Sequence, residues 1–141
     1  MNTALLVPAT VLVLWTLVML FWMAGTRLPA LKKMGIDMAA KPGGRGPDVD
    51  PVVPPQVAWK SHNHTHLMEQ PTLFYATIVI LTLSNGVSDL TIGVSWAYVG
   101  LRIVHSLWQS LVNTVTVRFL LFLASTFCLI ALALTALLNM L

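Results

Sequence analysis

Long stretches without a charged side chain constrain the fold of this chain more than any other feature. Residues 1–26 contain no charged residue, and the 23 residues of 119–141 contain none either. A helix rises about 1.5 Å per residue, so roughly 20 apolar residues cross the hydrocarbon core of a bilayer. Each of these two stretches is long enough to do so. The sequence therefore predicts an integral membrane protein, with the lipid bilayer as its surroundings.

Two further spans are expected between these stretches. Residues 70–88 carry no charge, and residues 90–112 form an apolar segment that one arginine and one histidine interrupt. The turn signal Ser84-Asn85-Gly86 separates the two segments. We therefore expect an all-α, four-helix membrane bundle in a single domain. Within residues 1–141, the expected helices cover about 3–26, 56–84, 90–112 and 116–140, with a loop at about 27–55.

The composition excludes several other classes of protein. Hydrophobic residues make up 57% of the chain and charged residues 9%, whereas a soluble domain has about 25% charged residues. This scarcity of charge excludes a disordered chain and most soluble enzymes. The net charge of +3 comes from 8 basic and 5 acidic residues, so we expect no nucleic-acid partner. Cys128 is the only cysteine and lies in an apolar run, which predicts a buried, inert thiol.

The loop between the first two spans differs in composition from the rest. It contains the run from Lys41 to Pro47, which is rich in proline and glycine, and this predicts a solvated, partly extended segment without a core. Basic residues gather in the loop, whereas Asp89 is the only charge expected on the opposite side. By the positive-inside rule the loop is then cytoplasmic and both termini are periplasmic. No basic residue precedes the first span, which favours a membrane helix over a secretory signal. We expect the bacterial inner membrane, with the endoplasmic reticulum as the alternative.

Polar residues within the spans are the first candidates for a site. Arg102 and His105 share a helix face in the third span, and Gln109 lies one turn further. A charge at this depth usually faces the bundle interior or a cavity. Two purely structural explanations stay open for Arg102: a side chain that reaches the interface, or an ion pair with Glu69. Arg118 begins the fourth span, either as an interfacial anchor or as an anion site that holds a thiolate.

A histidine-rich segment, residues 61–71, begins the second span. If this segment is helical, His62, His66 and Glu69 line one face at positions i, i+4 and i+7. These side chains suit zinc or iron, and interfacial histidines that bond the loop and lipid headgroups are the other interpretation. Polar residues of all four helices are expected at the same depth in the membrane. This predicts that they form one site. The residues expected to converge there are Arg27, Glu69, Arg102, His105 and Arg118.

Three stretches of this pattern resemble the MAPEG superfamily, whose members act in eicosanoid and glutathione metabolism. The stretches are Gly25-Thr26-Arg27-Leu28, His62 to Pro71, and Gly100 to His105. The most specific feature is the interval of 13 residues from His105 to Arg118, which matches the prostaglandin synthase branch. The resemblance covers most of the chain. It extends to the microsomal glutathione transferases and leukotriene C synthase.

The resemblance implies a homotrimer of four-helix bundles that binds glutathione as a cosubstrate in clefts between subunits. It implies a membrane-bound glutathione transferase or peroxidase that acts on a hydrophobic small molecule, an apolar electrophile, without a metal. Arg118 would be the catalytic residue that stabilises the glutathione thiolate. The residues that would bind the rest of glutathione are Arg27, His62, Asn63, His66, Glu69, Arg102, His105 and Gln109.

Two alternatives to an enzyme stay open. Family enzymes usually carry two arginines and an asparagine before the glutamate of the second helix, whereas this chain has His62, Thr65 and His66. This difference favours a non-catalytic, lipid-binding scaffold of the same fold. The second alternative is a His-rich, metal-binding membrane protein.

Overall fold

The computed structural model describes residues 3–40 and 42–141. It contains four long helices, with two short 3₁₀ turns between the first two, and the described residues form no β-strand. The prediction of an all-α, four-helix chain is confirmed. In chain order the elements are α1 (Leu6–Lys33), η1 (Met38–Ala40), η2 (Gly46–Val49), α2 (Pro55–Leu83), α3 (Asp89–Leu111) and α4 (Val115–Leu138).

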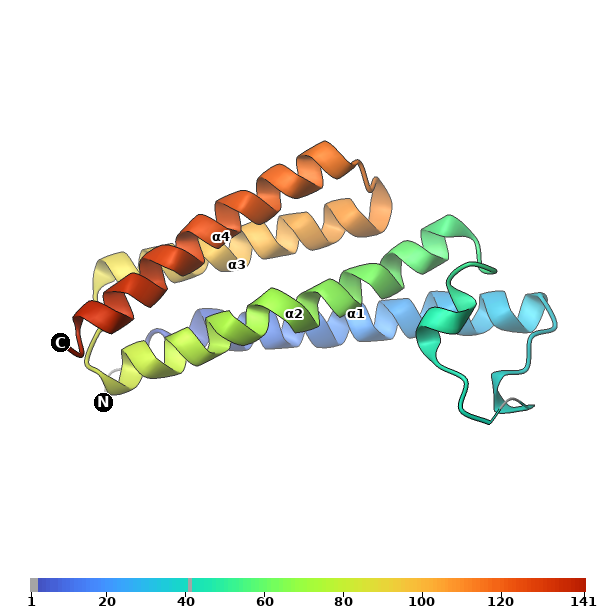
Figure 1. Ribbon diagram of the computed structural model, residues 1–141, viewed down its shortest axis with the longest axis horizontal. Helices are drawn as coiled ribbons and strands as arrows, with labels where there is room; N and C mark the ends of the chain where they lie inside the picture. The colour runs from blue at the N-terminus through green and yellow to red at the C-terminus, as the bar shows by residue number, and fades with distance from the viewer. Residues whose placement is uncertain (1–2, 41) are drawn as a thin grey trace.

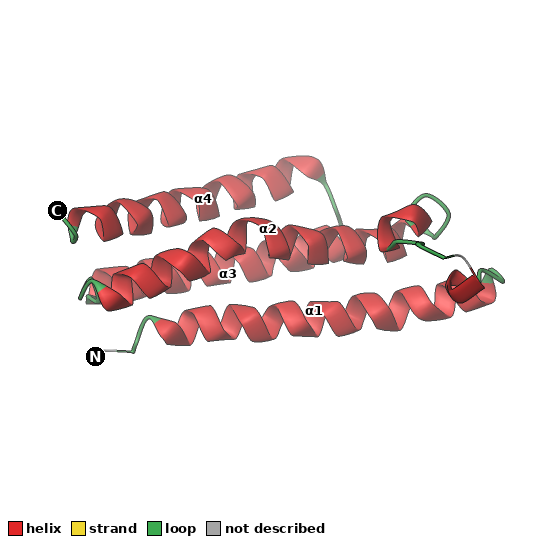
Figure 2. Cartoon of the chain, turned by 60° about the horizontal axis from the view of Figure 1, so that its bottom comes forward, coloured by secondary structure: helices red, strands yellow, loops and turns green. Residues whose placement is uncertain are grey.

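The four helices run side by side as an up-and-down bundle (Figure 1). Helix α1 packs mainly against α2, and α3 packs mainly against α4. Figure 2 shows α2 and α3 between α1 and α4. Short turns join α2 to α3 and α3 to α4, where Asn85 and Asn113 adopt φ angles of 56° and 59°. Asparagine tolerates this left-handed conformation better than most residues, so the sequence supports sharp reversals at both points.

Three of the helices, α1, α3 and α4, are long and apolar enough to cross a membrane. Large hydrophobic side chains, among them Phe21 and Phe127, stay exposed on the outside of the bundle. Lipid accommodates such a surface, and helices satisfy their backbone hydrogen bonds within it. The chain is therefore an integral membrane protein. Helix α2 has 29 residues but carries the polar segment Ser61 to Gln70 in its first half, so a fourth span in α2 stays a prediction.

Helix α1 extends seven residues beyond residue 26, where the first helix was expected to end. It continues through Pro29 and ends at Lys33, followed by Gly35, which adopts a φ of 68°. The N–H groups of Gly35 and Ile36 donate to the carbonyl groups of Lys32 and Leu31 at 3.1 and 3.0 Å, which is a Schellman end. Charged residues after position 26 suggested a loop, but they lie on the part of α1 that extends beyond the apolar span.

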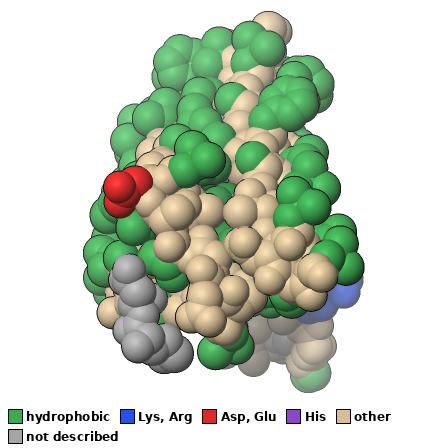
Figure 3. Space-filling model, turned by 90° about the vertical axis from the view of Figure 1, so that its left-hand side faces the viewer, with side chains coloured by type: hydrophobic (Ala, Val, Ile, Leu, Met, Phe, Trp, Pro, Cys, Tyr) green, Lys and Arg blue, Asp and Glu red, His purple; other side chains and the backbone are tan. Residues whose placement is uncertain are grey.

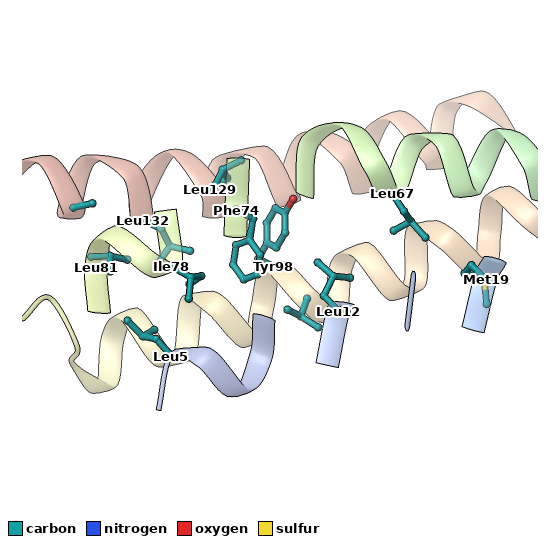
Figure 4. Close-up of a cluster of buried hydrophobic side chains, with 12 residues drawn as sticks. Leu5, Leu12, Met19, Leu67, Phe74, Ile78, Leu81, Tyr98, Leu129 and Leu132 are labelled. Carbon is teal, nitrogen blue, oxygen red and sulfur yellow. The ribbon is translucent and has the colours of Figure 1, made fainter. Parts of the chain in front are cut away.

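The main core lies along the seam between α1, α2 and α3 and extends to α4. In Figure 4, Leu12 of α1, Leu67 of α2 and Leu132 of α4 point into this seam. Phe74 and Tyr98 form its centre, because their rings stack with centroids 4.2 Å apart and planes inclined by 18°. Both side chains are fully buried. This packing fixes α2 against α3, and so fixes the polar residues that lie further along the same two helices.

The connection between α1 and α2 is more ordered than a solvated, extended loop. Val49 and Val53 are buried against Leu31 of α1 and Ala58 of α2, which forms a second, small apolar cluster. The expectation that this segment lacks a core was wrong, because Val49 and Val53 pack against the two helix ends. Lys41, which was expected in the same loop, lies outside the described residues.

The opposite end of the bundle holds both termini and carries little charge. Figure 3 shows this end, where hydrophobic and uncharged side chains cover most of the surface. Asp89 begins α3 here, after the cap residue Ser88, whose side chain accepts a hydrogen bond from the Thr91 N–H. Basic side chains instead gather near the long connection, at the other end of α1 and the beginning of α2.

Candidate functional site

A small pocket opens between α2, α3 and α4, near the turn that joins α3 to α4. Its volume is about 190 Å³. Histidines from two helices form one side, and an arginine and two phenylalanines of α4 form the other. The lining residues are His66, His105, Val115, Arg118, Phe119 and Phe122.

Two histidines from different helices form the inner wall of this pocket. The rings of His66 (α2) and His105 (α3) stack with centroids 4.8 Å apart and planes inclined by 16°. Phe122 of α4 meets His66 edge-on, with centroids 5.5 Å apart. His66 is therefore held between two other rings, and His105 is buried beneath it.

Arg118 lies in the first turn of α4 and supplies the positive charge of the pocket. Its Nη1–H donates to Oδ1 of Asn113, the residue whose left-handed backbone closes the turn between α3 and α4. Trp108 Nε1 donates to Thr114 Oγ1 at 2.8 Å across the same turn. The turn therefore fixes the guanidinium at the N-terminal end of α4, where the helix dipole also favours an anion.

Arg102 lies behind the pocket and does not line it. Its side chain is fully buried, and Nη2 donates to Nδ1 of His66 at 2.9 Å and to the backbone oxygen of His66 at 3.2 Å. Its Nε and Nη1 have no hydrogen-bond partner among the described residues. Neither structural explanation considered for Arg102 holds. The side chain does not reach the interface, and no ion pair among the described residues includes Glu69, which is exposed.

Further polar residues lie buried between α2 and α3. Asn63 Nδ2 donates to Ser106 Oγ at 2.8 Å, and both side chains are buried. Gln109 and Ser110 are also buried, and their side-chain oxygens have no partner among the described residues. Asn63 and Gln109 are therefore buried between the helices and do not line the pocket.

Arg27 and His62 lie apart from the pocket. Both contact Asp50 of the long connection. Arg27 and Asp50 form an ion pair, and both side chains are largely buried. His62 Nε2 lies 3.3 Å from the other carboxylate oxygen of Asp50. The predicted set of site residues is therefore divided: His66, His105 and Arg118 share the pocket with Arg102 behind it, whereas Arg27 and His62 hold the connection to α1 and α2.

The helical spacing of His62, His66 and Glu69 does not produce a metal centre. His62 turns to Asp50, His66 turns to Arg102, and Glu69 is exposed. Within residues 3–40 and 42–141, no three histidine, cysteine, aspartate or glutamate side chains gather closely enough to hold a metal ion. The alternative of a His-based metal site therefore has no support in the geometry.

Several residues of the site were not predicted. Phe119 and Phe122 follow Arg118 by one and four residues, and helical periodicity could have placed Phe122 on its face. No signal in the sequence points to Asp50 as the partner of Arg27. Ser106 is adjacent to His105 in sequence, but its bond to Asn63 depends on how α2 packs against α3.

A second, more apolar pocket continues along α2 and α4 one helical turn further into the membrane. Its volume is about 400 Å³. Gln70 Nε2 donates to Thr126 Oγ1 at 2.8 Å between the two pockets, and Tyr98 O–H donates to Gln70 Oε1 at 3.4 Å. The lining residues are Gln70, Leu73, Ala76, Thr77, Thr126, Leu129, Ile130 and Ala133.

Two larger pockets, of about 560 and 620 Å³, lie under the long connection. Among the described residues that line them, Lys32 supplies the one cationic group, and aspartates 37 and 48 supply the acidic groups. By size alone, these two pockets would be the candidates for a ligand site. The smaller pocket combines an arginine with two histidines and has no acidic lining residue, so it is the candidate site.

Comparison with known proteins agrees with the membrane helical fold. The model of the MAPEG family matches residues 5–138, which is nearly the whole chain. No curated protein and no solved structure gives a significant match. The match to the family model includes all four helices and every residue of the pocket. The chain is a member of the MAPEG family.

Proposed function

We propose that this protein is a membrane-bound, glutathione-dependent transferase or peroxidase, and that Arg118 stabilises the glutathione thiolate. The observation that carries the proposal is the composition of the 190 Å³ pocket. It joins a fixed guanidinium to two histidines and two phenylalanines, and none of its lining residues is acidic. A guanidinium offers charge-assisted hydrogen bonds to an anion, and a neighbouring positive charge favours the thiolate form of a thiol.

The thiolate is the nucleophile in this chemistry. In conjugation its sulfur attacks the electrophilic carbon of an apolar substrate, and a thioether forms as the leaving group departs. In peroxide reduction two glutathione molecules lose two electrons, and the products are glutathione disulfide, an alcohol and water. The protein contributes by lowering the free energy of the thiolate and by holding it beside the apolar substrate.

The pocket of one subunit is smaller than the whole of glutathione requires. Sites for small ligands have volumes of about 300–1,000 Å³, whereas this pocket has about 190 Å³. Glu69 is exposed on α2, three residues after His66, at a depth where a carboxylate needs a partner. Both features support a homotrimer in which a neighbouring copy completes the site.

The substrate is expected to be an apolar electrophile that enters from the lipid. The 400 Å³ pocket follows the candidate site along α2 and α4, and apolar side chains form most of its lining. Gln70 and Thr126 separate the two pockets. An apolar molecule in the second pocket would therefore lie one helical turn from the sulfur.

The orientation follows from the distribution of charge. Basic side chains gather at the end of α1, in the long connection and at the beginning of α2. We infer that this end is cytoplasmic and that both termini are periplasmic, in a bacterial inner membrane. Cytoplasmic glutathione would then reach the pocket from the side where α3 turns into α4.

A lipid-binding scaffold is the second candidate. The observation that favours it is the shortage of arginines at the pocket, because Arg118 is the only arginine among the described residues that line it. Arg102 is buried and Arg27 is paired with Asp50. A scaffold would bind an apolar ligand in the second pocket without binding glutathione.

Calorimetry with glutathione separates the two candidates. The detergent-purified protein is expected to bind glutathione, and Arg118→Ala is expected to weaken binding by about tenfold or more, since a hydrogen bond to a charged group contributes about 1.5–3 kcal/mol. Arg45→Ala is the matched control, because that arginine is exposed on the long connection. Absence of binding at several times the cytoplasmic concentration of glutathione would exclude the transferase and leave the scaffold.

A further inference from the structure

We propose that Arg102 is a positioning residue that fixes the tautomer of His66, so that the Nε2–H of His66 is a second donor to the anion bound beside Arg118. The inference rests on the proposed function, because it takes that anion to be the glutathione thiolate.

The first step follows from what a guanidinium can do. Arginine carries N–H donors and has no acceptor, so the nitrogen that it meets must accept. Nη2 of Arg102 lies 2.9 Å from Nδ1 of His66. Nδ1 therefore carries no proton, and the proton of the neutral ring is on Nε2.

The second step concerns the direction of that proton. Nε2 lies on the other edge of the ring from Nδ1, and it makes no hydrogen bond with the described residues. It is not among the buried, unpartnered polar atoms, so it is open to a ligand. His66 lines the pocket together with Arg118. The Nε2–H is therefore available to an anion in the pocket that also contacts Arg118.

The third step is that the ring has little freedom to rotate. Arg102 Nη2 also donates to the backbone oxygen of His66 at 3.2 Å, so one group holds both the ring and the helix. His105 stacks on one face of the ring and Phe122 meets it edge-on. A ring held in this way loses little entropy when it donates to a ligand.

The buried arginine itself needs an explanation, which this role supplies. Its exposed fraction is 0%, and Nε and Nη1 have no partner among the described residues. Burial of an unpaired charge is costly. If Arg102 acts by holding His66, it needs neither a carboxylate partner nor direct access to the pocket.

Nuclear magnetic resonance of the histidine side chains tests the tautomer directly and needs no ligand. With ring-¹⁵N histidine in detergent micelles, His66 is expected to show a protonated Nε2 and an unprotonated Nδ1. The loss of its signals in His66→Asn assigns them. In Arg102→Met the preference for one tautomer is expected to disappear. A protonated Nδ1 in the unmodified protein would overturn the proposal, whether or not Arg102→Met folds.

Two substitutions of His66 then separate its two nitrogens. Asparagine keeps an acceptor near the place of Nδ1 and loses the donor at Nε2, whereas glutamine places an N–H near Nε2. We expect His66→Asn to weaken glutathione binding by about tenfold, as for a lost bond to a charged group, and His66→Gln to keep most of the affinity. Binding of S-hexylglutathione, which has no thiolate, is expected to change little in either variant.

The outcomes distinguish this proposal from the proposed function. If the unmodified protein binds glutathione while His66→Asn binds it equally well, the role of His66 is wrong and the transferase stands. If the protein binds no glutathione, the proposed function fails, and the assignment of the thiolate as the anion fails with it. An equal loss of affinity for glutathione and S-hexylglutathione in His66→Asn would show a structural role and overturn the donor role.

Discussion

At the scale of single residues, the fold depends on how a few large side chains pack between α2 and α3. Helices in lipid gain little from leaving water, so close packing contributes more to their association than hydrophobic burial does. Phe74 and Tyr98 are fully buried and stack with centroids 4.2 Å apart. The same two helices carry His66, Arg102 and His105. Packing at this pair therefore also determines the geometry of the pocket.

Phe74→Ala is expected to destabilise the protein by about 2 kcal/mol or more, because it removes a ring from a closely packed seam and leaves a cavity. Thermal unfolding in detergent measures the loss. Phe127→Ala is the matched control, since Phe127 is 62% exposed on the outside of α4. Equal effects of the two substitutions would contradict the core described here.

Single residues also show what the sequence could not predict about the site. The three-residue interval places Arg102 and His105 on one helix face, and the structure agrees. The partner of Arg102 depends on the rotation of α2 about its axis, which decides that His66 and not Glu69 turns toward α3. The sequence periodicity of a single helix does not predict how that helix is rotated against its neighbour.

At the scale of elements, the connection between α1 and α2 is the part that departs most from a simple membrane bundle. Val49 and Val53 pack on Leu31 and Ala58, and Asp50 contacts both Arg27 and His62. Runs of proline and glycine suggested an extended loop, but a few apolar residues and one carboxylate are enough to anchor it. The helices α2, α3 and α4 begin and end within two residues of the expected ranges, because turn residues and charge mark their ends.

Asp50→Asn is expected to release this connection from α1 and α2. The substitution removes the charge that pairs with the largely buried Arg27 and that attracts His62. An unpaired, buried charge is costly, so the connection should detach locally while the bundle stays folded. Limited proteolysis is expected to cut the connection several times faster than in the unmodified protein.

The control for this experiment is Asp48→Asn. Asp48 pairs with Arg45, and both side chains are exposed, so this ion pair contributes little. Its cleavage rate should match that of the unmodified protein. If Asp50→Asn were cleaved no faster than Asp48→Asn, the anchoring role of Asp50 would be wrong.

For the whole molecule, we propose that one chain needs neighbouring copies to complete its site. The pocket is small, Glu69 is exposed without an ion-pair partner among the described residues, and the exposed hydrophobic surface is extensive. Lipid can cover the hydrophobic surface, but if α2 spans the membrane as predicted, lipid chains cannot neutralise the Glu69 carboxylate. Contacts between copies depend on surfaces that a single sequence does not mark, which is why the homotrimer comes from resemblance to the family.

The mass of the purified protein, measured by light scattering with the detergent subtracted, is expected to equal three copies. Glu69→Gln is expected to lower the temperature at which the trimer dissociates, because it removes the charge that a neighbouring copy would pair. Asp89→Asn, at the end of the bundle that holds the termini, is the control and should leave that temperature unchanged. A monomer at all protein concentrations would exclude a site shared between copies.

If Arg118 holds glutathione as its thiolate, the ultraviolet absorbance of the bound thiolate reveals it. Free glutathione is mostly a protonated thiol near neutral pH, because an ordinary thiol has a pKa of about 8.5. A difference spectrum of the protein with glutathione is therefore expected to show thiolate absorbance at neutral pH, and Arg118→Ala is expected to remove it. A protein that binds glutathione without this absorbance, or an Arg118→Ala variant that keeps it, would contradict the account.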